Sequence, residues 1–414
     1  MDPYLFIIVA ASAIIISHLF NLLAKRTNIP SVLMLIVLGL IIHQVIMHYG
    51  SYSPGPLVTQ VLNVLGISGL IMIVLEAALD LKLTADHRSL VLRSSLVALL
   101  TLGGTAAAIT YLIHTITGAE VYKCLVYAVP LSIVSSAIVL PSVAQLPKKR
   151  KEFMVYEATL SDIFGIMLFY FLVEDHEGAS NTRIAMAFGG NVLLTIVVSV
   201  IASIGLLWIF QRIRSKVKFF LLIAVLMLLY ALGKKMNLSS LLIILVFGLV
   251  VSNQSLIFRG WMSRIMGTTG IGNIERELHL VTAETAFVVR TFFFLVFGLT
   301  IDVRRLLDGD VLMIGAAVTV VIYLVRLIVT AAFRVNGIGI ITAVAPRGLI
   351  TILLAYNIPD QYRIPDRDGS VLLMVILATS LVMMVGMMTT GKQHDLSAVE
   401  PDLDSFGSAE PDQG

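Results

Sequence analysis

Residues 156–165 read YEATLSDIFG and form the first half of an apolar stretch, 153–173, that is long enough to span a bilayer. The stretch contains two carboxylates, and an acid at membrane depth costs about 2.5 to 3.5 kcal/mol on insertion scales, so such residues are mostly functional. Glu157 and Asp162 are five positions apart and therefore point about 140° away from each other around a helix. We expect different partners for them: a water-filled cavity with a cation or proton for Asp162, and a buried base for Glu157.

The composition indicates a polytopic membrane protein. Hydrophobic residues make up 58% of the chain, charged residues make up 13%, and the mean hydropathy is +0.95. The first apolar stretch, 4–24, has no basic residues before it and no small-residue cleavage site after it, so we expect a retained span and not a signal peptide. The single cysteine, Cys124, excludes an intramolecular disulfide and is expected to be a packing residue.

Hydrophobic segments recur along the chain at lengths close to the roughly 20 residues that cross the hydrocarbon. We expect an all-α membrane protein with about thirteen transmembrane helices, at 3–23, 31–49, 57–79, 90–116, 121–146, 153–173, 184–210, 217–232, 238–254, 279–301, 311–333, 337–357 and 369–390. The connections are short, so residues 1–390 are expected to form one transmembrane domain. Residues 391–414 are acidic with few apolar residues, which predicts a disordered tail.

Lysine and arginine are concentrated on one side of this topology. With the N-terminus outside, most of these residues fall in inside loops, and the dense run Lys148 to Lys151 carries the most weight. The positive-inside rule therefore predicts an outside N-terminus and a cytoplasmic C-terminus. We expect a multi-pass protein of the cell (inner) membrane.

Two of the segments are interrupted in the same way. Segment 121–146 contains Pro130 and Pro141, and segment 337–357 contains Pro346 among several glycines. Proline breaks helical hydrogen bonding, and exposed backbone at membrane depth is tolerated only where it lines protein or a cavity. The interruptions are seven segments apart, which fits two inverted repeats with broken helices in matching positions. That arrangement is typical of a transporter whose binding site lies near the midplane.

Five stretches of the chain resemble, in order, the motifs of monovalent cation:proton antiporters, the sodium/proton exchanger class, and most closely its electroneutral branch. The resemblance covers about residues 5–390. It is strongest at EATLSD, which is similar to the Glu-Ser-x-x-Asn-Asp signature, and at APRGLI, which is similar to the Gly-Pro-Arg-Gly motif. The five stretches are LEAALDLK (75–82), SSAIVL (135–140), EATLSD (157–162), FLVFGLTID (294–302) and APRGLI (345–350).

Two positions depart from the family pattern. Ser161 stands where the electroneutral branch usually has Asn and the electrogenic branch usually has Asp. The Asp often found in the first unwound helix is also absent, and Ser136 or Ala137 takes its place.

The resemblance implies the sodium/proton antiporter fold, with two broken helices that cross. It implies exchange of Na⁺, K⁺ or Li⁺ for H⁺ by alternating access, which would contribute to pH homeostasis. No enzymatic activity is expected. A core bundle (90–173 and 311–390) would move against a scaffold (3–79 and 217–301), and the scaffold would form a homodimer. No cofactor, nucleotide or nucleic acid is expected. The resemblance also implies a buried salt bridge between Glu157 and Arg347.

Asp162 is the strongest candidate for the binding site, because a carboxylate suits a hard alkali cation and can also carry a proton. Ser161 and Thr159 could add hydroxyl ligands or serve helix packing. Ser135 and Ser136 could supply oxygens opposite Asp162, or they could be ordinary small residues at a helix interface.

Other charged residues also fall in or near spans. We expect them either to line the access funnel or, preferably, to form interhelical pairs; they are Glu76, Glu284, Arg290 and Arg326.

Three other functions are considered. An ion channel would have a continuous pore, which the paired broken helices and single buried acid argue against. An organic solute symporter would need additional polar or aromatic residues near Asp162, and few are present. A membrane sensor would be inactive in proteoliposomes. No arrangement typical of enzymatic catalysis stands out in the sequence.

Overall fold

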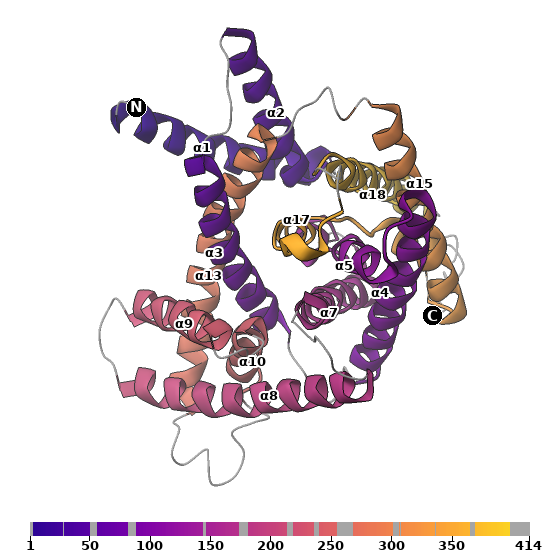
Figure 1. Ribbon diagram of the computed structural model, residues 1–414. Coiled ribbons are helices and arrows are strands. Elements are labelled where there is room, and N and C mark those ends of the chain that lie inside the picture. Colours follow the sequence, from indigo (N-terminus) through magenta and orange to yellow (C-terminus); the bar gives the residue numbers. More distant parts are fainter. Residues whose placement is uncertain are drawn as a thin grey trace, which may run out of the picture.

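The computed structural model of the protein describes residues 3–27, 29–49, 56–81, 88–143, 146–173, 181–212, 218–235, 240–254, 268–300, 306, 308–335, 337–364 and 369–397. Every regular element in these ranges is a helix (Figure 1). Their bounds are α1 Pro3–Thr27, α2 Ser31–Tyr49, α3 Pro56–Asp80, α4 Arg88–Thr117, α5 Val121–Ser132, α6 Ser136–Ser142, α7 Lys148–Val173, α8 Asn181–Arg212, α9 Lys218–Lys235, α10 Ser240–Ser252, α13 Thr268–Leu299, α15 Gly309–Ala332, α16 Ile338–Ala343, α17 Leu349–Tyr356, the 3₁₀ helix η2 Asp360–Tyr362, and α18 Gly369–Ser397.

These helices coincide with the apolar segments of the sequence. Eight helical stretches in the described ranges are long and apolar enough to cross a membrane by length and composition, and α8 and α10 contain shorter apolar stretches. The all-α prediction is therefore confirmed. The count of about thirteen crossings stays a prediction.

The helices pack in two groups, which Figure 1 shows on opposite sides of the molecule. In one group α13 packs against α2 and α3, and α10 packs against α3, α8 and α9. In the other group α4 packs against α5, α7 and α15, and α18 packs against α15 and α16. The short helix α17 lies between the groups, in contact with α3, α5 and α7.

Helices α2 and α13 approach each other closely at a pair of glycines. A Cβ atom at Gly39 would lie 2.9 Å from the Cα of Gly298, and a Cβ at Gly298 would lie 2.5 Å from the carbonyl oxygen of Ile36. Small residues allow backbones to approach in this way inside membranes, where apolar side chains gain nothing by leaving lipid.

Both predicted interruptions are confirmed. Helix α5 ends at Ser132 and α6 begins at Ser136, with extended backbone at Ile133 and Ser135 between them. Helix α16 ends at Ala343 and α17 begins at Leu349, and Pro346 lies in the gap. Proline disfavours helical backbone at the residue before it, so Pro346 accounts for the second break.

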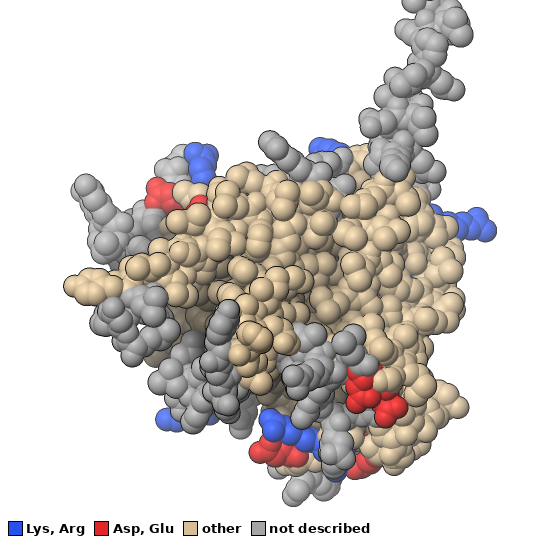
Figure 2. Space-filling view, turned by 90° about the horizontal axis from the view of Figure 1, so that it is seen from above, with Lys and Arg blue, Asp and Glu red and all other residues tan. Residues whose placement is uncertain are grey.

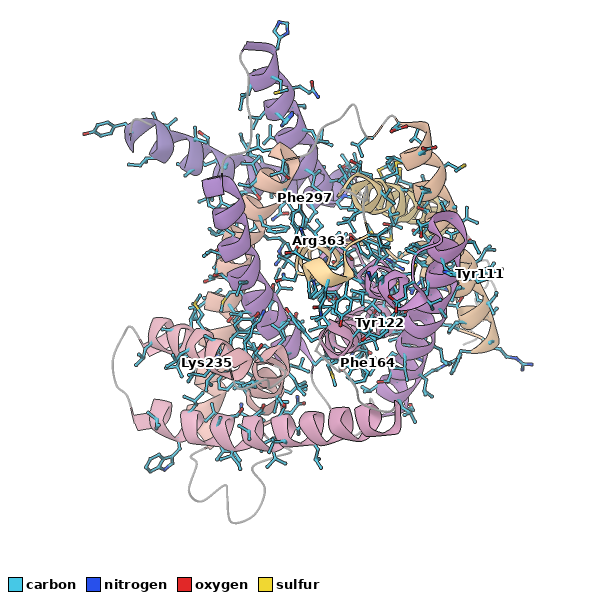
Figure 3. The ribbon with its side chains drawn as sticks, in the orientation of Figure 1. Tyr111, Tyr122, Phe164, Lys235, Phe297 and Arg363 are labelled. Atoms are coloured by element: carbon cyan, nitrogen blue, oxygen red, sulfur yellow. The ribbon has the colours of Figure 1, made fainter. Side chains whose placement is uncertain are left out.

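The outer surface is that of a protein in lipid. In Figure 2 most of the coloured surface is tan, and the charged residues lie at its edges. Tyr111 on α4 points away from the bundle in Figure 3 and is 72% exposed. Large apolar side chains on α1, α8, α15 and α18 are exposed in the same way.

Helix α18 continues past the predicted domain boundary at residue 390 and ends at Ser397. Residues 398–414, which make up the remainder of the predicted acidic tail, lie outside the described residues.

Candidate functional site

The two broken helices meet at their breaks. The backbone N–H of Ser135 donates to the carbonyl oxygen of Pro346 at 2.9 Å. The N–H of Arg347 donates to Thr379 Oγ1 on α18 at 3.1 Å. The approach is close, because a Cβ at Gly348 would lie 2.5 Å from Ser135 Oγ. Backbone groups freed by one break thus find partners in the other break and in a neighbouring helix, as membrane depth requires.

Two side chains of α7, both from the stretch 156–165, accept hydrogen bonds from backbone N–H groups of the first break. Ser161 Oγ accepts a hydrogen bond from the N–H of Val134 at 3.0 Å. Asp162 Oδ2 accepts one from the N–H of Ser136, also at 3.0 Å. Both side chains are buried, with 2% and 3% of their surface exposed. Two neighbouring residues of α7 therefore hold the unwound backbone between α5 and α6.

Three buried oxygens at this place have no hydrogen-bond partner among the described residues: Asp162 Oδ1, Thr159 Oγ1 and Ser135 Oγ. Buried polar groups are nearly always paired, so each such exception calls for an explanation. Carboxylate and hydroxyl oxygens are the ligands that suit hard cations. The arrangement can therefore accept a cation or a proton at Asp162.

A void of about 20 Å³ adjoins the carboxylate and is lined by Thr159 and Asp162 together with apolar residues of α3, α7, α10 and α17. A space of roughly 10 to 15 Å³ on this measure holds one water molecule. The void is therefore large enough for one water molecule, or one ion of similar size, beside the carboxylate.

A larger cavity of about 600 Å³ reaches the same place from one side of the molecule. Ser136 lines this cavity, and Ala77 lines both it and the small void. Its other lining residues include the C-terminal part of α6 and the end of α1, which is the side on which the basic run 148–151 begins α7. Water and ions on that side can thus approach Asp162.

Glu76 and Arg290 lie in the wall of this cavity and pair with each other. The Arg290 Nη2 to Glu76 Oε2 distance is 3.0 Å, and Arg290 Nη1 also lies 3.5 Å from the carbonyl oxygen of Ala137. Both roles considered for these two residues, funnel lining and interhelical pairing, are therefore present together. Glu284 is exposed on α13.

The expected salt bridge between Glu157 and Arg347 is wrong. Glu157 instead binds Arg326 of α15 through both carboxylate oxygens, at 2.6 and 2.9 Å, and both residues are 1% exposed. Arg326 also donates to the carbonyl oxygens of Ile341 and Val344, at the end of α16. The bidentate geometry and the extra carbonyls satisfy a buried pair whose desolvation would otherwise be costly.

Arg347 donates hydrogen bonds to backbone carbonyl oxygens and not to a carboxylate. Its Nε donates to the carbonyl oxygen of Leu131 at 2.6 Å, and its Nη1 donates to that of Ala345 at 2.9 Å. None of the ion pairs found in the described ranges includes it. The sequence analysis expected Arg326 to line the funnel or to form an interhelical pair. Which of the two buried arginines pairs with Glu157 depends on tertiary geometry.

The structure thus brings Ser161, Asp162 and Ser136 together through the backbone of the first break, with Ser135 in that break and Thr159 at the void beside Asp162. Their role as ligands stays a prediction.

Comparison with known proteins supports the fold. Two similar solved structures are of the sodium proton antiporter MjNhaP1 from Methanocaldococcus jannaschii. The structure at pH 8 has a TM-score of 0.67 and 16% sequence identity, covering 97% of this chain and 99% of that chain. The electron-microscopy structure has a TM-score of 0.62 and 15% identity, covering all of both chains. At this identity the likeness shows the fold, which is the antiporter fold.

A search of the curated proteins gave no significant match. The family profile described as "Sodium/hydrogen exchanger, transmembrane" matches residues 10–391, which is nearly the whole chain. That family consists of transporters and not enzymes. The chain belongs to the transmembrane sodium/hydrogen exchanger family.

Proposed function

We propose that the protein exchanges Na⁺ for H⁺ across the membrane, with Asp162 binding either the cation or the proton in turn. One observation carries this proposal: a buried carboxylate with one oxygen bound to backbone and the other without a hydrogen-bond partner among the described residues, beside a void that shares lining residues with a large cavity. A carboxylate that binds one cation or one proton, but not both, couples the two gradients by competition.

The cation ligands would be Asp162 Oδ1 with the free hydroxyls of Thr159 and Ser135, supplemented by Ser136, Ser161 and water. Ser161 Oγ already accepts a hydrogen bond from Val134, and its remaining lone pair is available for a cation. Such a site, with neutral hydroxyls around one charge, could also accept K⁺ or Li⁺. The ion series in the experiment below decides among them.

Exchange would proceed by alternating access. The group containing α4, α5, α7, α15 and α18 would move as a core against the scaffold of α2, α3, α10 and α13. The arrangement described here has its cavity on the side of the basic run 148–151. The small void beside Asp162 is lined by apolar residues of α7 and α10, among them Ile166, Met167 and Leu242. With the basic run in the cytoplasm and the N-terminus outside, this would be the inward-open state.

The host membrane would be the cell (inner) membrane, where exchange of Na⁺ for H⁺ contributes to pH homeostasis. The protein would be a homodimer formed through scaffold helices.

Transport would be electroneutral, one cation for one proton. Glu157 has a fixed partner in Arg326 and Glu76 has one in Arg290, so Asp162 is, among these three described carboxylates, the one left to change its state during the cycle. Moving one net charge would couple the rate to about 2.3 kcal/mol per 100 mV, whereas a 1:1 exchange should not respond to voltage. A potential set with K⁺ and valinomycin in vesicles assayed with Na⁺ should leave the initial rate unchanged. A clear voltage dependence would contradict this stoichiometry.

Proton flux in proteoliposomes, measured against Na⁺, K⁺ and Li⁺ gradients, tests the function itself. Asp162→Asn should abolish flux, because an amide can neither release a proton nor neutralise a cation. The matched control is Asp310→Asn, which removes an exposed carboxylate at the start of α15 and should leave flux unchanged. Normal flux in the folded Asp162→Asn protein would refute the proposal.

A further inference from the structure

A second cavity, of about 520 Å³, lies between α16 and α18, away from the path that leads to Asp162. It is lined by one charged residue, Arg150, and by mostly small or apolar residues on and next to α16 and α18. These are Gly337, Gly339, Ile340, Ala343, Val382, Val385, Gly386 and Thr389. We call it the α16–α18 crevice. It shares no lining residue with the cavity that reaches Ser136.

The walls of the crevice face the lipid. Val382 is 38% exposed and Val385 is 56% exposed, and both lie on an apolar stretch of α18 long enough to cross the membrane. Small residues leave the space open, since a Cβ at Gly339 would meet nothing within 4 Å. The crevice is therefore a slot whose α18 wall carries exposed apolar side chains, with room for a hydrocarbon chain.

Arg150 lines the crevice next to Gly337. Gly337 has a left-handed backbone, with φ of +86°, and a Cβ on it would lie 3.0 Å from Arg150 Nε and 3.1 Å from Cζ. The guanidinium thus lies directly against the backbone that precedes α16. No ion pair of the described residues includes Arg150.

The surroundings of Arg150 are strongly basic. Lys149 and Lys151 are its exposed neighbours in the chain, and the carboxylate of Glu152 lies 3.9 Å from Lys148 Nζ. On the adjacent helix end, Arg93 donates to the carbonyl oxygens of Phe333 and Arg334. A positive rim at a membrane surface attracts anionic lipid.

We propose that the α16–α18 crevice binds one anionic phospholipid. Its phosphate pairs with Arg150, and one acyl chain lies along Ile340, Val382 and Val385. The amphipathic lining favours this occupant, because a slot with one cation and exposed apolar side chains offers partners to both parts of an anionic phospholipid. The acidic tail of the chain, 398–414, would match the charge but leave the apolar walls unfilled.

The bound lipid would stabilise the first half of the second broken helix. Helix α16 packs against α18 at Ala343 and Gly386, and the last turn of α16 accepts hydrogen bonds from Arg326. A ligand that bridges α16 and α18 binds the folded protein and not the unfolded chain, so it raises the melting temperature.

The test uses the full-length protein in a neutral detergent with added phospholipid. Phosphatidylglycerol should raise the melting temperature by several degrees, and native mass spectrometry should retain one molecule per chain. Phosphatidylcholine and inorganic phosphate should each give less than half of that shift. Arg150→Gln should lose the shift and the retained lipid, whereas Lys148→Gln, the same charge change outside the crevice, should keep both.

A second variant fills the slot without changing charge. Gly339→Leu places a side chain where the acyl chain would lie, so it should also lose the retained lipid while transport in proteoliposomes continues. Equal shifts with phosphatidylcholine would overturn the proposal, as would retained phosphatidylglycerol in Arg150→Gln or Gly339→Leu. A shift with inorganic phosphate equal to that with the lipid would show that an anion alone occupies the site, and would overturn it too.

Discussion

Removal of one member of the Glu157 and Arg326 pair should destabilise the protein strongly, because it leaves a buried charge without a partner. Loss of one partner of such a pair costs about 3 to 5 kcal/mol. Glu157→Gln removes the carboxylate charge and leaves Arg326 its two carbonyl partners, Ile341 and Val344. Arg326→Met also leaves those carbonyls unpaired, at about 1 to 3 kcal/mol each, so it should be the more damaging change.

The double variant Glu157→Gln/Arg326→Met should recover part of the loss. For residues in direct contact the interaction energy lies at about 0.5 to 3 kcal/mol, and the bidentate geometry here favours the upper end of that range. Free energies of unfolding would be measured in mixed detergent micelles for the four members of the cycle.

A parallel cycle with Arg347→Met in place of Arg326→Met provides the control. Arg347 binds the carbonyl oxygens of Leu131 and Ala345, so its interaction energy with Glu157 should be clearly smaller. An interaction energy for Arg347 equal to or above that for Arg326 would refute the assignment of the pair.

Two further predictions concern the breaks. Gly348→Ala should greatly reduce transport, because its Cβ would lie 2.5 Å from Ser135 Oγ. The control Gly103→Ala on α4, where a Cβ meets nothing within 4 Å, should leave transport unchanged. Equal fluxes in the two variants would count against a close approach of the two breaks. Ser161→Ala should lower the free energy of unfolding by about 1 to 3 kcal/mol, because the buried N–H of Val134 loses its acceptor. An unchanged unfolding curve for Ser161→Ala would show that this hydrogen bond is not needed.

Much of the fold could be predicted because the membrane restricts the choices. Apolar length located the helices, and Pro346 marked the second break. Pro130 and Pro141 marked the interrupted segment but lie inside α5 and α6, on either side of the first break. The 140° between Glu157 and Asp162 correctly gave them different partners, since that angle follows from helix geometry alone. These are local properties of the chain.

The partner of Glu157 could not be predicted in this way. Two arginines, Arg326 and Arg347, are buried in the same bundle, and both satisfy the rule that a buried acid needs a buried base. Which of them reaches Glu157 depends on how α15 crosses α7 and on which carbonyls each break leaves free. That information is not contained in either segment, and the family pattern pointed to the wrong one.

The hydrogen bonds around the first break explain how Asp162 could change its state without loss of structure. Its Oδ2 accepts from the N–H of Ser136, while its Oδ1 has no hydrogen-bond partner in the part of the chain that the structure describes. A cation or a proton at Oδ1 would leave the bond at Oδ2 in place, so α6 would remain attached to α7 in both states. An asparagine at 162 keeps one oxygen for Ser136 and should therefore preserve the fold while removing the charge. The carboxylate would thus divide its two oxygens between structure and transport.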